Sequence, residues 1–221
     1  MLIIFDLDDT LIDTSGSITP LQLKRALQAM VEAGLSVDDF EKAYVMLRQI
    51  DATCESSSQT LKEFLIRVGA DLVFLTIGQK NVYGPIPDDL PIIPLNHAFK
   101  ILKNLKKSHQ LAVVSIGNPD QQRLKMEKAG LDSALFSKIV ISTEEDKKSA
   151  YVEVLKSLSA DPAQTVVCGD RIKRDLTPAK QLGCITIQME WGRGLCSTGS
   201  PSDVDFKIQS LSEIEEIIEK L

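Results

Sequence analysis

The feature that most constrains the fold is a regular alternation, from about residue 100 to the end, of short apolar runs with segments of helical pattern. Leu111–Ser115 is a continuous apolar run, which is typical of a strand buried on both faces. The predicted strands are Leu111–Ser115, Lys138–Ser142, Thr165–Cys168 and Ile185–Met189. Strands that alternate with helices form right-handed βαβ units. The sequence therefore predicts an α/β fold with a doubly wound, mostly parallel sheet.

Residue types at the ends of the intervening segments predict helix boundaries. Asn118 is a suitable N-cap with Pro119 as the first helical residue, and Gly130 is placed to end that helix. The next helix has one apolar stripe, made of Tyr151, Val154, Leu155 and Leu158. A C-terminal helix is predicted to open with Ser212 and Glu215, at the spacing of a capping box. It would bury Leu211, Ile214, Ile217, Ile218 and Leu221.

A further strand is predicted at residues 2–7, and it ends in carboxylates at alternate positions. Residues two apart point the same way in an extended chain, so Asp6 and Asp8 project together while Leu7 stays with the core. Desolvated like charges repel, and a divalent cation such as Mg²⁺ relieves that repulsion. The pair suits a nucleophile beside a general acid and base. The alternative is a strand followed by a solvated acidic turn.

The stretch from about residue 15 to residue 90 breaks the alternation. Helical patterns cover Leu21–Val31, Val37–Ile50 and Thr60–Val68, with no comparable strand between them, and a proline-rich stretch follows. We expect residues 16–89 to form a helical cap inserted into a core made of residues 1–15 and 90–221. The alternative is an independent N-terminal helical domain, which would leave the strand at residues 2–7 without a sheet.

In a doubly wound sheet, ligands bind beyond the carboxyl ends of the strands, and four strand ends bring polar groups to that edge. These are Asp6 and Asp8 at the first, Ser115 with Gly117 and Asn118 at the second, Lys147 and Lys148 at the third, and Asp170 with Asp175 at the fourth. A hydroxyl and open amides near a helix start suit a phosphoryl oxygen. Serine and asparagine are also common caps, and neighbouring lysines are commonly solvated.

In this order the four motifs resemble those of the haloacid dehalogenase (HAD) superfamily of aspartate-nucleophile hydrolases. Residues 6–10 (D-L-D-D-T) match the first motif of that family, D-x-D-x-T, and Gly169-Asp170 with Asp175 match the fourth. The resemblance covers residues 1–15 and about 90–221. The helical insertion looks like the type-1 cap of the family. Gly169–Gly183, with the segment around Trp191-Gly192-Arg193, is similar to its small-molecule phosphatase branch.

The resemblance implies a role for each matched residue. Asp6 would attack phosphorus and become an aspartyl phosphate, and Asp8 would protonate the leaving oxygen and then activate water. Ser115 would bind the transferring phosphoryl group. Mg²⁺ would be held by Asp6, the backbone carbonyl of Asp8 and Asp170, with Asp175 close behind.

Two departures from the family pattern affect the second and third motifs. Ile116 stands between Ser115 and Gly117, so the amide that faces phosphate is left open. The third-motif lysine is often followed by proline in relatives and is not here. Lys147 is the preferred site lysine, and Lys148 remains the alternative.

Composition narrows the class of partner. Net charge is −6 and no apolar run approaches the roughly 20 residues of a membrane span, so we expect neither nucleic acid nor membrane as a partner. The four cysteines show no C-x-x-C spacing, and no signal segment is recognisable in the sequence. We therefore expect a cytoplasmic protein with reduced thiols. The expected substrate is a small phosphorylated metabolite. The sequence leaves the oligomeric state open.

Three alternatives to a phosphatase differ in chemistry. A dehalogenase would use Asp6 but has no use for an acid at position 8, and a phosphomutase would need a cap that excludes water. A non-catalytic phosphate-binding or regulatory protein would need no acid at position 8 either. The complete set of motif residues favours the phosphatase.

Overall fold

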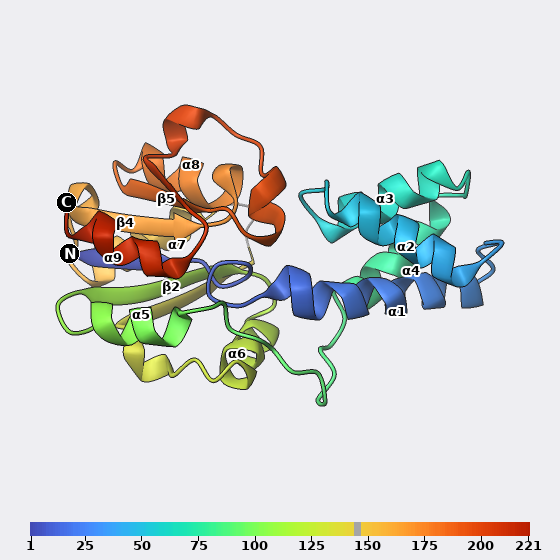
Figure 1. Ribbon diagram of the computed structural model, residues 1–221, viewed down its shortest axis with the longest axis horizontal. Coiled ribbons are helices and arrows are strands. Elements are labelled where there is room, and N and C mark those ends of the chain that lie inside the picture. Colours follow the sequence, from blue (N-terminus) through green and yellow to red (C-terminus); the bar gives the residue numbers. More distant parts are fainter. Residues whose placement is uncertain (144–146) are drawn as a thin grey trace. The chain divides into compact units, whose positions relative to one another are not determined.

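The computed structural model describes residues 1–143 and 147–221, and these form two compact units (Figure 1). The first unit consists of Met1–Asp13 and Pro91–Leu221, and the second consists of Thr14–Leu90. Among the described residues, no helix combines the length and the apolar character that crossing a bilayer would require.

The first unit is built on a six-stranded sheet of order β3-β2-β1-β4-β5-β6, in which every neighbouring pair is parallel. Its strands are β1 (Leu2–Phe5), β2 (Gln110–Ile116), β3 (Lys138–Ser142), β4 (Thr165–Gly169), β5 (Ile185–Met189) and β6 (Phe206–Ile208). The predicted doubly wound α/β fold is confirmed. The strand β6 was not predicted, because a three-residue strand carries too little periodic pattern to be recognised.

Helices follow the strands in the order that right-handed crossovers require. They are α5 (Ala98–Leu105), α6 (Pro119–Lys128), α7 (Lys148–Ser157), α8 (Thr177–Gln181) and α9 (Ile214–Ile218). The chain moves from β1 to β3 in one direction and from β4 to β6 in the other, so α5 and α6 cover one face while α7 and α8 cover the opposite face. The direction reverses between β1 and β4, which makes their carboxyl ends the expected ligand crevice.

Apolar side chains join α7 and α8 to the sheet. Leu2 and Ile4, two residues apart on β1, lie on the sheet face that α7 and α8 cover. They belong to one apolar cluster with Tyr151 and Val154 of α7 and Ala179 of α8. The predicted stripe on α7 is therefore confirmed, with Leu158 half-buried at its end. This packing fixes the helices behind the strands whose ends carry the polar residues.

The C-terminal helix differs from its prediction in two ways. The capping box is formed by Ser210 and Glu213 rather than by Ser212 and Glu215, and it opens a short turn that leads into α9. β6 ends at Ile208, and the capped turn begins at Ser210, two residues earlier than the predicted start at Ser212. Leu221 is 49% exposed rather than buried, because it lies beyond the end of α9.

The second unit contains the helices α1 (Thr19–Glu32), α2 (Phe40–Asp51), α3 (Ser57–Arg67) and α4 (Val73–Val82) around an apolar core of their own. The first three correspond to the predicted helices, whereas α4 was not predicted. In α4 a Cβ on Gly78 would lie 3.0 Å from Leu61 Cδ1 and 3.0 Å from Met30 Sδ. Glycine at this position therefore allows α4 to pack closely on α1 and α3.

Candidate active site

Asp6 stands at the carboxyl end of β1 because the chain turns sharply just after it. The Asp6 amide continues the sheet by donating to Cys168 O at 2.9 Å. The Leu7 carbonyl then accepts hydrogen bonds from Leu11 N at 2.9 Å and from Ile12 N at 3.1 Å, which close a single tight turn. Leu7 is fully buried. The sheet therefore anchors Asp6 on one side and a buried leucine fixes the turn on the other.

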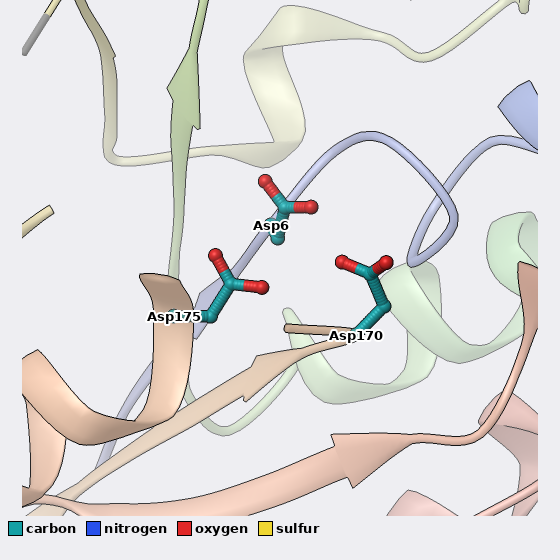
Figure 2. Close-up of side chains that lie close together, drawn as sticks. All are labelled: Asp6, Asp170 and Asp175. Atoms are coloured by element: carbon teal, nitrogen blue, oxygen red, sulfur yellow. The ribbon is translucent and has the colours of Figure 1, made fainter. Parts of the chain in front are cut away.

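Three buried carboxylates meet at this edge of the sheet. Asp170 directly follows β4, and Asp175 lies in the wide turn Ile172–Leu176. Each of Asp6, Asp170 and Asp175 offers an oxygen within 4.8 Å of those of the other two. Figure 2 shows the three side chains converging from separate segments of the chain. The structure thus brings together the first and fourth motifs, which are more than 150 positions apart in the sequence.

Lys147, rather than Lys148, reaches these carboxylates. Its ammonium group forms ion pairs with Asp6 Oδ1 and, at 2.7 Å, with Asp175 Oδ1, and the residue is only 2% exposed. Lys148 Nζ instead donates to Gln181 Oε1 at 3.0 Å on the surface. Lys147 precedes α7 directly, so one residue of helical rotation separates a buried ammonium group from an exposed one.

Burial and mutual repulsion shift the titration of the cluster. Desolvation, together with Asp175 and Asp8, raises the pKa of Asp6 to about 7 even though Lys147 acts in the opposite direction. Burial and Asp175 likewise hold the pKa of Asp170 well above its usual value. Burial lowers the pKa of Lys147, but Asp175 and Asp6 outweigh it and the pKa is raised. Burial, together with the neighbouring carboxylates, therefore outweighs the effect of the adjacent cations on Asp6 and Asp170.

The donor set fits a hard divalent cation. Among the residues that the structure describes, these three carboxylates face two cationic side chains, those of Lys147 and Arg171. The Nε atom of Arg171 lies 3.4 Å from Asp170 Oδ2. A further positive charge would offset the remaining repulsion, and carboxylate oxygens are the ligands that Mg²⁺ favours. Both oxygens of Asp175 already have partners, since Oδ1 pairs with Lys147 and Oδ2 accepts from Arg171 N at 2.8 Å.

The carboxylate of Asp8 lies against α6 rather than among the three carboxylates. Asp8 Oδ2 accepts from Gln122 Nε2 at 2.7 Å, and Asp8 Oδ1 pairs with Lys125 Nζ at 2.7 Å. The same Gln122 nitrogen donates to Ser115 Oγ at 2.6 Å. Asp8 and Ser115, which belong to separate motifs, are therefore joined by one amide group.

Sequence reasoning missed Gln122 and Lys125. Positions 122, 125, 126 and 129 lie at the i, i+3, i+4 and i+7 spacing of an inward helix face. The last two are the apolar Met126 and Ala129, but the first two are polar. Two polar residues at one end of an otherwise apolar helix face were the pattern from which their role in the site could have been predicted.

Gly117 and Asn118 shape the start of α6. Gly117 has φ +148°, and a Cβ there would lie 3.3 Å from Gln122 Cδ, so glycine suits both the backbone and the close approach of that amide. Asn118 Oδ1 accepts from Asp120 N at 3.0 Å and from Gln121 N at 3.1 Å. The predicted N-cap is therefore confirmed, and the Asn118 side chain is engaged in capping.

The loop after β5 supports Asp170. A Cβ on Gly194 would lie 2.2 Å from Met189 O and 3.2 Å from Asp170 Cβ, so the loop backbone packs directly on this carboxylate residue. Trp191 Nε1 donates to Asp13 Oδ1 at 3.1 Å, which ties the loop to the end of the first chain segment. The segment around Trp191 thus stabilises the edge that carries the site.

Comparison with known proteins agrees with this geometry. A family model described as haloacid dehalogenase-like hydrolase matches residues 1–183. A Methanocaldococcus jannaschii protein named glyceraldehyde 3-phosphate phosphatase is 30% identical over 99% of this chain and 97% of its own length. A Pyrococcus furiosus protein of the same name is 28% identical over 99% of this chain and 93% of its own length.

Solved structures share the fold at lower identity. A HAD phosphatase from Thermococcus onnurineus has a TM-score of 0.64 at 19% identity, covering 98% of this chain and 97% of its own. A haloacid dehalogenase-like hydrolase from Xanthomonas campestris has a TM-score of 0.66 at 16% identity, covering 100% of this chain and 95% of its own. The family resemblance read from the motifs is confirmed: the chain is an enzyme of the haloacid dehalogenase-like hydrolase family.

Proposed function

We propose that the chain is a Mg²⁺-dependent phosphatase that hydrolyses a small phosphorylated metabolite through a phosphorylated Asp6. The observation that carries the proposal is the buried pairing of Asp6 with Lys147 beside Asp170 at the end of β1. Family membership and the phosphatase names of the curated relatives make the chain a phosphatase enzyme. The metal, the covalent intermediate and the substrate are the proposed parts.

Four side chains would carry the reaction. A carboxylate oxygen of Asp6 attacks phosphorus while Asp8 gives a proton to the leaving oxygen. Water then attacks the aspartyl phosphate and Asp8 takes up its proton, which releases phosphate and restores Asp6. Lys147 offsets the negative charge on Asp6 and on the transferring group. The Ser115 hydroxyl accepts from Gln122 and can donate its own hydrogen to a phosphoryl oxygen.

Asp6, Asp170 and the backbone carbonyl of Asp8 would hold Mg²⁺, with Asp175 close behind. A bound divalent cation offsets the repulsion between an anionic nucleophile and an anionic phosphate. Because Lys147 and Arg171 N already occupy the oxygens of Asp175, we assign Asp175 to fixing Lys147 and the turn after Asp170.

For the substrate we propose a short phosphorylated aldehyde or polyol, with glyceraldehyde 3-phosphate as the first candidate. The support is the shared name of curated relatives that cover nearly the whole chain. We further propose that residues 16–89 act as a cap that selects the substrate. Their helical unit has its own apolar core, so it can keep its structure while the connecting segments change.

The proposal is tested by phosphate release from a panel of sugar phosphates, nucleotides and short phosphoacids that includes glyceraldehyde 3-phosphate. We expect turnover with Mg²⁺ and loss of turnover in EDTA. Asp6→Asn keeps the side-chain shape but removes the nucleophile, so activity should fall by about 10⁴-fold or more. If Asp6→Asn retains a tenth of the activity, the nucleophile assignment is wrong. Halide release from 2-chloropropionate without phosphate release would instead identify a dehalogenase.

A further inference from the structure

We propose that Gln122 and Lys125 of α6 are positioning residues for Asp8, which hold its carboxylate by both oxygens and align it with Ser115. This inference rests on the proposed phosphatase function and deepens it. Neither residue belongs to the four motifs from which the site was predicted.

The contacts form a continuous chain of side chains. Lys125 Nζ and Gln122 Nε2 each lie 2.7 Å from a different oxygen of Asp8. Gln122 Nε2 also lies 2.6 Å from Ser115 Oγ. Gln122 is 2% exposed, and the side chains of Lys125 and Asp8 are 13% and 28% exposed. Two donors on one helix therefore fix the orientation of a carboxylate that is separated from them by more than 110 residues.

A purely structural role accounts poorly for these residue types. Burying an amide or an ammonium group costs free energy unless its partners are in place, and an apolar residue would pack at the same positions without that cost. The C-terminal part of the same helix face is apolar, and its residues Met126 and Ala129 are buried. Gln122 and Lys125 occupy the part of this face that contacts Asp8 and Ser115. The polar residues therefore lie only where the face meets the candidate site.

Orientation matters because Asp8 must transfer a proton in both half-reactions. In the first, its proton moves to the leaving oxygen as the bond from Asp6 to phosphorus forms and the bond to the leaving group breaks. In the second, the carboxylate takes a proton from the attacking water as the bond from Asp6 to phosphorus breaks. A displaced reacting group costs rate even when binding is unchanged. The two donors on α6 limit the rotation of Asp8.

The experiment compares Lys125→Met and Gln122→Met with the wild type on two substrates of unequal leaving group, p-nitrophenyl phosphate and glycerol phosphate. Lys125→Met should lower kcat/KM for glycerol phosphate by about 10- to 100-fold, because alkoxide departure needs a well-placed acid. The loss for p-nitrophenyl phosphate should be at most about fivefold, because p-nitrophenolate leaves without strong assistance. Gln122→Met should show the same asymmetry.

Three controls accompany the comparison. Inhibition of Lys125→Met by inorganic phosphate should change by less than about threefold, because Lys125 contacts Asp8 and is not assigned to anion binding. Lys125→Arg, which keeps a cationic donor, should recover part of the loss on glycerol phosphate. Lys156→Met, at an exposed position of α7, should match the wild type and control for the loss of a lysine charge.

Equal losses on the two substrates, or weaker inhibition of Lys125→Met by phosphate, would overturn the inference in favour of substrate binding or general destabilisation. If Lys125→Met does not fold, as judged by circular dichroism, Gln122→Met and Lys125→Arg decide by the same ratio of losses. Wild-type protein that turns over neither substrate nor any member of the metabolite panel would refute the proposed function instead. The two failures are therefore distinguishable.

Discussion

The backbone of Gly169 lies directly against the side chain of Asp175. A Cβ on Gly169 would lie 2.6 Å from Asp175 Cβ and 2.7 Å from Asp175 Oδ2. Atoms that approach this closely must move, and Asp175 in turn holds Lys147 and the amide of Arg171. The glycine before the fourth-motif aspartate is therefore required by packing at the site.

Gly169→Ala is predicted to displace Asp175 and to lower both stability and activity. Overpacking of this kind costs about 1–3 kcal/mol, and the displaced Lys147 should reduce kcat by about tenfold or more. Urea unfolding and steady-state kinetics measure the two effects. In an Asp175→Gly background the added methyl meets no side chain at this position, so Gly169→Ala should cost much less there. Equal costs in the two backgrounds would show that the close approach to Asp175 is not the cause.

Replacing the two neighbouring lysines separates their roles. Lys147→Met removes the buried cation beside Asp6 and should reduce kcat by about 10²–10³-fold, as for the loss of one electrostatic donor. Lys148→Met removes a surface contact with Gln181 and should keep nearly wild-type activity. Kinetics of both variants with saturating Mg²⁺ give the comparison. The reverse order of effects would make Lys148 the site lysine.

Stability without metal should fall as the pH rises. Burial, Asp175 and Asp8 raise the pKa of Asp6 to about 7, and burial raises the pKa of Asp170, whereas both titrate near 3.8 when unperturbed. From roughly pH 4 to 7 the folded protein keeps protons that the unfolded chain has lost. More bound protons in the folded state mean that the free energy of unfolding decreases with increasing pH.

A divalent cation that binds the ionised carboxylates should offset this loss. Mg²⁺ is therefore predicted to raise Tm more at about pH 8 than at about pH 5.5, because protons compete with the metal at the lower pH. Thermal unfolding with Mg²⁺ and with EDTA measures the difference. Asp170→Asn removes one of the repelling charges and should raise Tm in EDTA at the higher pH. A Mg²⁺ effect of equal size at both pH values would contradict the coupling.

The proposed cap role of residues 16–89 predicts ligand-dependent protection of the connecting segments. The chain enters the helical unit near Thr14–Gly16 and leaves it near Gly84–Pro91, where few residues would have to absorb any hinge motion. BeF₃⁻ with Mg²⁺ mimics the phosphorylated aspartate and should slow limited proteolysis at both segments. Cleavage near α9 serves as the control and should not change. An identical cleavage pattern with and without BeF₃⁻ would exclude closure.

Strand and helix alternation, which is local in the sequence, determined most of the fold in advance. Runs such as Leu111–Ser115 and Thr165–Cys168 are apolar because helices cover both faces of the sheet. This apolar pattern can be recognised in the sequence without knowing which segments pack against the strand. The strand β6 was not predicted because three residues show too little of a period, and the helices α4 and α5 were not predicted either. The capping box is formed at Ser210, two residues after the end of β6, rather than at the predicted Ser212.

The sequence by itself also determined that Asp6 and Asp170 stand at strand ends, because alternation along a strand and the sharp turns that follow are local properties. Only the tertiary structure decided which lysine meets them, since Lys147 and Lys148 differ by one step of helical rotation and their partners lie far away in the chain. It likewise decided that Gln122 and Lys125 hold Asp8. Contacts between residues more than 100 positions apart depend on how the elements pack, and no local period encodes them.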